Sequence, residues 1–402
     1  MTKRLSACAA ALIVCVATCA SAQDVTSEDT RTQYPAFLTD SYFTVDVGRI
    51  GYVFSGDQLE PGFRAASIDV PGLAVRVDLF GYHVLKHLSA QITYLRPARY
   101  VAYRSINGDP ATSQVSTAYA GLTLVADVPL NPHLSGYIEG GLGITSRSGI
   151  VINGVTALHS AHYAAGLVGA GLAYHATPTI DVIFGATYSP GRKSLTQPST
   201  RLYTTGIRYN MRALSAATVE ENRRSGFAFP ENVVRLGYTS NVLSYGVNNF
   251  FSQTVPIFWG GNVETRQGYT LDYERNVFHT KKKFAFDLGA SASYWKSDGN
   301  GDHFATLSFY PLFRFFLART EPADVYFSYS LAGPTLMSDT VLDGRDTGER
   351  FTFQDFMGLG MFFGKDRRLN AELGIKHYSN GNIFTQNASI KIPLTLTLGL
   401  TF

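Results

Sequence analysis

The residues of this chain best suited to chemistry lie near its C-terminal end, where a histidine and a serine are separated by one residue. His377 and Ser379 close the segment 371–379, in which the odd positions form a largely apolar face. This alternation has the period of a β-strand. Residues two apart on a strand share a face, with Cβ atoms about 6–7 Å apart, so these side chains can approach hydrogen-bonding distance. A serine beside a histidine is a candidate nucleophile with its base.

The segment also carries a recognisable motif. His377-Tyr378-Ser379-Asn380-Gly381, followed by Asn387 and a final amphipathic strand over residues 394–402, resembles the motif of the PagL-type lipid A 3-O-deacylases, which are eight-stranded outer-membrane barrels. The resemblance implies that Ser379 is the nucleophile, His377 the base and Asn387 the oxyanion donor. It also implies oxyanion or substrate contacts for two further asparagines, Asn380 and Asn382. No cofactor is implied.

The acid of the triad is the point at which the chain departs from this family. The family's glutamate lies fourteen residues after the histidine, where this chain has Lys391. If a short turn over residues 364–368 joins two antiparallel strands, Asp355 lies opposite His377 on the apolar face of its strand. An outward carboxylate among apolar side chains is costly unless an imidazolium partners it. We therefore predict Asp355 as the acid, the other reading being a rim residue bonded to lipid headgroups. Glu372 has the opposite parity and is expected in the lumen.

The N-terminal residues and the composition indicate an exported membrane protein. Residues 1–22 combine a basic start, an apolar run and an Ala-Ser-Ala end, which predicts a signal peptide. It contains all three cysteines, Cys8, Cys15 and Cys19, so the mature chain would have neither a disulfide nor a cysteine metal site. No later apolar run approaches the ~20 residues of a membrane helix. The content of 38 Gly, 23 Tyr and 27 Phe, in alternating segments of about ten residues, is typical of transmembrane β-barrels.

The pattern of segments divides the rest of the chain. Long polar connections alternate with short turns through residues 40–212 and again through 233–402, while the charged stretch 213–232 breaks the alternation. The predicted fold is all-β: two tandem antiparallel transmembrane β-barrels of about eight strands each, an OmpA-like barrel and a deacylase-like barrel, joined by a periplasmic linker. A single barrel of about sixteen strands with a polar channel is the alternative. Inside the first barrel, Arg76, Asp78 and Gln91 are expected to pair.

The barrel pattern predicts a protein of the cell outer membrane, and the resemblance to the deacylases implies that it is an enzyme. Its expected partners are lipopolysaccharide, whose lipid A is the substrate, the membrane itself and the barrel assembly machinery that inserts such proteins. The net charge of +3 offers no basis for nucleic-acid binding. No metal site is expected, because the closely spaced histidine pairs lack an evident third ligand. The predicted function is a serine esterase removing the 3-O-linked acyl chain of lipid A. The alternative is a non-enzymatic barrel (adhesin, structural protein or porin) with a degenerate deacylase-like domain.

Overall fold

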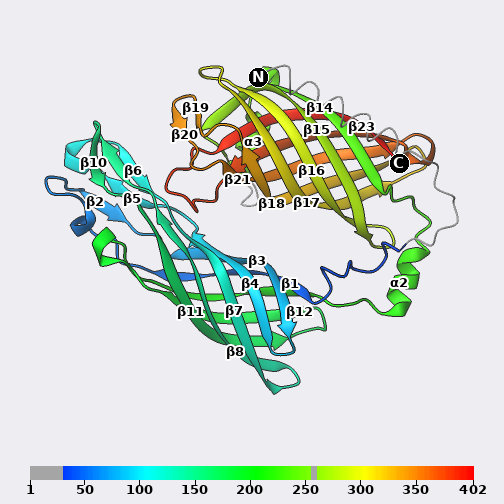
Figure 1. The fold of residues 1–402 in the computed structure, drawn as a ribbon, viewed down its shortest axis with the longest axis horizontal. Coiled ribbons are helices and arrows are strands. Elements are labelled where there is room, and N and C mark those ends of the chain that lie inside the picture. Colours follow the sequence, from blue (N-terminus) through cyan, green and yellow to red (C-terminus); the bar gives the residue numbers. More distant parts are fainter. Residues whose placement is uncertain (1–29, 255–259) are drawn as a thin grey trace.

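Two closed antiparallel β-barrels of eight strands each make up the molecule (Figure 1). The structure, a computed structural model, describes residues 30–254 and 260–402. The predicted fold class is confirmed, and the alternative of one large barrel is wrong. The predicted signal peptide lies outside the described residues.

The strands of each barrel follow one another in sequence, and each barrel closes by pairing its first strand with its last barrel strand. The first barrel consists of β1 (Ser41–Gly51), β3 (Leu73–Leu85), β4 (Leu88–Pro97), β7 (Thr117–Asn131), β8 (Leu134–Arg147), β11 (Ala161–His175), β12 (Ile180–Ser189) and β13 (Thr200–Met211). The second consists of β14 (Asn232–Ser240), β15 (Val263–His279), β16 (Phe284–Ser297), β17 (His303–Arg319), β18 (Ala323–Met337), β21 (Phe351–Phe363), β22 (Leu369–Ser379) and β23 (Ile390–Thr401).

The long connections of both barrels lie at one end of the molecule, which we call the outer rim (Figure 1). They fold into small sheets formed by β2 (Ser67–Asp69), β5 (Val101–Arg104) and β6 (Thr112–Val115), by β9 (Ile150–Ile152) and β10 (Val155–Leu158), and by β19 (Val341–Leu342) and β20 (Arg345–Asp346). Helix α3 (Gly246–Thr254) also lies there, whereas helix α2 (Ala216–Arg223) lies between the barrels in sequence, at the opposite end. None of the helices in the described ranges is long and apolar enough to cross a membrane.

The alternation of side chains along the strands explains why a chain of zero mean hydropathy forms barrels. In β23, Leu396, Leu398 and Leu400 are 48–58% exposed on the outer wall, whereas Thr395 and Thr397 are buried inside. Period-two patterning directs apolar side chains toward lipid and small polar ones toward the lumen. Averaging the two faces hides this apolar band, so mean hydropathy misses it.

Charged side chains fill the lumen of the first barrel. The guanidinium of Arg76 donates to both carboxylate oxygens of Glu139, at 2.6 and 2.7 Å, and to Asp78 at 3.1 Å. Gln91 donates to Asp78 and accepts from the hydroxyl of Tyr42. The predicted pairing of Arg76, Asp78 and Gln91 is confirmed. Buried charges that are paired and hydrogen-bonded in this way can be retained inside a narrow barrel.

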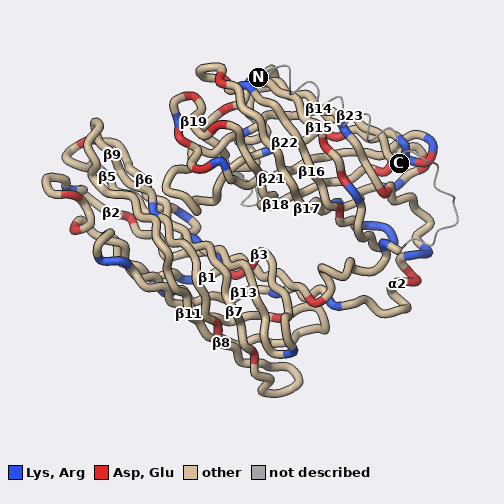
Figure 2. The backbone as a smooth tube through the Cα atoms, in the orientation of Figure 1, with Lys and Arg blue, Asp and Glu red and all other residues tan. Residues whose placement is uncertain are grey.

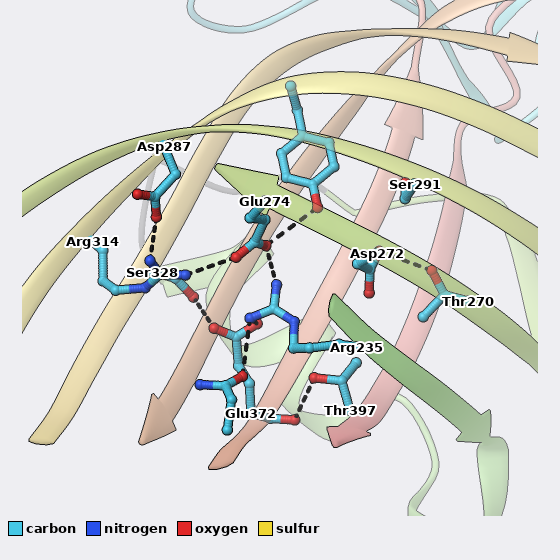
Figure 3. Close-up of polar contacts among 12 residues, drawn as sticks. Arg235, Thr270, Asp272, Glu274, Asp287, Ser291, Arg314, Ser328, Glu372 and Thr397 are labelled. Atoms are coloured by element: carbon cyan, nitrogen blue, oxygen red, sulfur yellow. Dashed lines mark hydrogen bonds and ion pairs between the residues drawn. The ribbon is translucent and has the colours of Figure 1, made fainter. Parts of the chain in front are cut away.

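The second barrel contains a larger network of ion pairs across its lumen (Figure 3). Arg314 pairs with Asp287 and with Glu274, the latter at 2.7 Å, and Arg235 pairs with Glu274 and with Glu372. The position of Glu372 inside the lumen agrees with its predicted parity. Together with Lys376 and its partner Asp272, these side chains come from five of the eight strands, so the network ties opposite walls together.

Candidate active site on the outer wall

A histidine and an aspartate from adjacent strands meet on the outer wall near the outer rim. Strands β21 and β22 pair in the predicted register, with Phe363 opposite Leu369 and Asp355 opposite His377. His377 Nδ1 lies 3.1 Å from Asp355 Oδ2. The carboxylate can accept a hydrogen bond only if Nδ1 carries the proton, which assigns the acceptor role to Nε2. In this tautomer His377 can remove a proton from a hydroxyl.

The second oxygen of Asp355 is held by a bulge in the neighbouring strand. Strand β18 shifts register between Ser330 and Gly333, and Ala332 within this bulge has a left-handed φ of 55°. The bulge directs the Ala332 N–H toward Asp355 Oδ1, at 2.9 Å. Both carboxylate oxygens are therefore fixed, one by the backbone and one by His377. β-Bulges commonly re-aim groups next to active sites.

Other parts of the protein cover the outer wall around this pair, whereas the outer wall is exposed farther along the same strands. Leu359 and Leu373, on the same face of β21 and β22, are 55% and 50% exposed, whereas Asp355 and His377 are 6% and 2% exposed. Part of the cover is α3, whose Phe251 packs against Met357 and Ile375. The His377–Asp355 pair is thus shielded from both water and bulk lipid, and low local dielectric strengthens its hydrogen bond.

Ser379 ends β22, and its hydroxyl donates to Asn387 Oδ1 at 3.3 Å. Asn387 Nδ2 donates to Ser379 Oγ at 3.0 Å, and the backbone N–H of Gly381 donates to the same oxygen at 3.2 Å. Within the described residues, Ser379 makes no hydrogen bond to His377. The two residues share a face of β22, and catalytic hydrogen bonds often tighten only when substrate is bound.

The other two predicted asparagines make different contacts in the loop that joins β22 to β23. Asn382 Oδ1 accepts from Asn387 Nδ2 at 3.0 Å and so orients the amide that faces Ser379. Asn380 instead donates from Nδ2 to the carbonyls of Thr347 and Gln386. Its side chain therefore fixes the loop, and its backbone N–H donates to Asn387 Oδ1.

Lys391 lies at the position of the family's glutamate but binds residues outside the predicted triad. It lies opposite His377 in the pairing of β22 with β23. Its ammonium group binds Glu264 at 2.8 Å and Asn249 of α3 at 3.2 Å. The two strands beside β22 thus carry a carboxylate on one side and a lysine on the other.

Contacts from the first barrel to this loop were not foreseen from the sequence. Figure 1 shows the red β22–β23 loop reaching toward the first barrel. The Tyr94 hydroxyl donates to the carbonyl of Gly381 at 2.5 Å, and Asn382 Nδ2 donates to the Tyr100 hydroxyl at 3.2 Å. The ring of His162 stacks on that of Phe384, with 5.9 Å between centroids. No sequence motif marks these residues, because the contacts depend on how two separate barrels pack.

A family model matches most of the second barrel. Residues 263–400 match the family model described as Lipid A 3-O-deacylase (PagL). No curated protein matches the sequence significantly.

Similar solved structures include the outer membrane enzyme PagL (18% identity, TM-score 0.31, 42% of this chain and 99% of that one). Neisserial surface protein A has 15% identity and a TM-score of 0.30, covering 42% of this chain and 97% of that one. The N-terminal β-barrel domain of Pseudomonas aeruginosa OprF has 14% identity and a TM-score of 0.27, covering 43% of this chain and 98% of that one. Residues 263–400 form a PagL-family domain, carried by a two-barrel protein of the outer membrane.

Proposed function

We propose that the second barrel is a serine esterase that removes the 3-O-linked acyl chain from lipid A. The observation that carries this proposal is the aligned set Ala332, Asp355 and His377, whose contacts of 2.9 and 3.1 Å orient a base beside Ser379. A strained bulge and a buried aspartate–histidine pair on the outer wall of a barrel are costly for the fold. Their position at the end of the apolar wall suits a substrate whose acyl chains are in the membrane and whose sugars are at its surface.

The reaction follows from these positions. His377 Nε2 takes the proton of the Ser379 hydroxyl as Oγ attacks the ester carbonyl, and Asp355 stabilises the imidazolium that forms. The carbonyl oxygen becomes an oxyanion, for which Asn387 Nδ2 and the Gly381 N–H are the nearby donors. Collapse of this intermediate breaks the ester bond. The proton on His377 passes to the departing 3-oxygen of the sugar, which leaves as a hydroxyl.

Water then completes the cycle. His377 removes a proton from a water molecule, which attacks the acyl-serine and passes through a second oxyanion held by the same donors. The products are a free fatty acid and lipid A with a free 3-hydroxyl group, and Ser379 regains its proton. The residues named here supply every proton transfer, so the steps balance without a further reactant.

Lys391 favours one rival function, a barrel that kept the motif but lost the reaction, because it replaces the family's acid and binds Glu264 instead. Fatty-acid release distinguishes the two. The purified, detergent-folded protein is incubated with lipid A, and released fatty acid is quantified beside matched Ser379→Ala and His377→Ala proteins. The esterase is supported if the wild-type protein releases fatty acid and each variant releases it at least 10³-fold more slowly. A loss of this size is expected when a member of the triad is removed. If the folded wild-type protein releases no fatty acid, the rival function is supported.

A further inference from the structure

A basic hollow at the outer rim of the first barrel lies next to the catalytic loop of the second. The hollow has a volume of about 580 Å³, and its lining includes Arg96, Arg99 and Arg104 but only one carboxylate, that of Asp69. Three positive charges against one negative leave a net charge of two positive. Figure 2 shows Lys and Arg positions in this part of the first barrel, beside β6.

The arginines are arranged so that their charge remains available. Arg104 pairs with Asp69 only at 3.9 Å, and both side chains are more than half exposed. Arg96 is held over the ring of Tyr100, with 5.5 Å from its guanidinium carbon to the ring centroid. Arg99 is exposed at the edge of the hollow. Guanidinium groups hold phosphate oxygens through paired, charge-assisted hydrogen bonds, so this lining suits a phosphate monoester.

A chain of hydrogen bonds connects the hollow to the nucleophile. Tyr100, which lines the hollow, accepts from Asn382 at 3.2 Å; Asn382 accepts from Asn387, and Asn387 donates to Ser379, both at 3.0 Å. Three successive hydrogen bonds therefore join the Tyr100 hydroxyl to Ser379 Oγ, which places the hollow near the nucleophile.

We propose that this hollow binds the phosphorylated sugar headgroup of lipid A and thereby presents the 3-O-ester to Ser379. The assignment rests on the proposed deacylase function. In a phosphorylated and acylated glucosamine, the phosphate and the ester are substituents of one ring, so holding the phosphate fixes the ester's position. The first barrel is then a substrate-recognition domain for the second. Binding of the headgroup lowers KM and leaves the chemical step to the second barrel.

The test separates binding from catalysis by using the full-length Ser379→Ala protein. Its affinity is measured by titration calorimetry in detergent for lipid A with its phosphates and for the same lipid A after enzymatic dephosphorylation. The combined Arg99→Gln and Arg104→Gln substitutions are then introduced, both at exposed positions. Arg192→Gln, in the connection between β12 and β13, is the matched control because Arg192 is exposed but outside the hollow.

We expect phosphorylated lipid A to bind at least about tenfold more tightly than the dephosphorylated form, and the double substitution to remove that difference. Arg192→Gln should preserve it. Equal affinity for the two lipids, or a preference that survives the double substitution, would overturn the proposal. Inorganic phosphate that binds as tightly as lipid A would overturn it too, by showing a general anion site. These outcomes do not depend on turnover, so a failure of the deacylase assay is distinguishable from a failure here.

Discussion

Asp355 is the residue whose substitution tests the catalytic arrangement most sharply. Its site needs two acceptors, because Oδ1 accepts from the Ala332 N–H at 2.9 Å and Oδ2 faces His377 Nδ1 at 3.1 Å. Asparagine has one acceptor and one donor group. In Asp355→Asn, either the Ala332 N–H or the protonated Nδ1 of His377 must face an NH₂ group. The first arrangement breaks the bulge contact, and the second forces the histidine into the wrong tautomer.

The expected loss of activity is large. Replacing the acid of a Ser-His-Asp triad by asparagine lowers kcat by about 10⁴-fold, which is about 5.5 kcal/mol at about 1.4 kcal/mol per tenfold. We expect kcat to fall by at least about 10³-fold with KM little changed, since Asp355 does not touch the substrate. Stability should fall by only about 1–3 kcal/mol for the unsatisfied contact. Initial rates of fatty-acid release are measured, and urea unfolding of the same samples checks the fold.

A second-site change makes this test specific. Lys391 lies opposite His377 on the other side of β22, so Lys391→Glu in an Asp355→Ala background returns a carboxylate to the family's position. We expect Lys391→Glu to raise the kcat of the Asp355→Ala enzyme at least about tenfold, whereas Lys391→Gln should not raise it. An Asp355→Asn enzyme within threefold of the wild-type rate would refute the assignment of the acid.

Three further outcomes follow from other contacts. Tyr100→Phe removes the hydrogen bond to Asn382, worth about 1 kcal/mol, so kcat should fall about fivefold, and steady-state rates at saturating lipid A measure it. Arg314→Ala leaves two luminal carboxylates with one fewer cation and should cost about 3–5 kcal/mol, seen as a lower urea midpoint in unfolding curves. Burial raises the pKa of the Asp343 carboxyl, but hydrogen bonds from Ser297 and two backbone N–H groups outweigh it and leave that pKa lowered. Because the folded pKa is below the unfolded one, this stabilisation is present above the ordinary value of 3.8 and is lost as pH falls through the folded pKa. The protection factor of the Asn300 amide, whose N–H bonds Asp343, should therefore fall on acidification in the wild type, and it should be lower and less dependent on pH in Asp343→Asn.

The alternation of apolar and polar residues in the sequence was enough to predict both barrels and the register of one strand pair. Alternation in residues 351–363 and 369–379, with a short turn between them, placed Asp355 opposite His377 because a hairpin's register is fixed by its turn. The observed pairing agrees. The sequence could not show how Ala332 reaches Asp355, because a bulge depends on a local backbone choice with no period of its own. Nor could it show that the long connection between β14 and β15 contains helix α3, which lies over the site.

Contacts between separately folded units are the other feature beyond sequence reasoning. Tyr94 and Tyr100 fit their own barrel's pattern, and nothing in that pattern distinguishes them from other aromatic residues near a membrane surface. Their role emerges only when the β22–β23 loop meets the first barrel. The same holds for the basic hollow, since Arg96, Arg99 and Arg104 come together with Asp69 only when the connections of the first barrel fold into a small sheet.

The account's central claim is that Ser379 attacks the 3-O-ester of lipid A, and tandem mass spectrometry of lipid A tests it most directly. Lipid A is incubated with the detergent-folded wild-type protein and, in parallel, with Ser379→Ala, and fragment ions locate each remaining acyl chain. The account predicts loss of one chain from the 3-position with the wild type alone. Unchanged lipid A in the presence of folded wild-type protein, loss with both proteins, or loss from another position would contradict it.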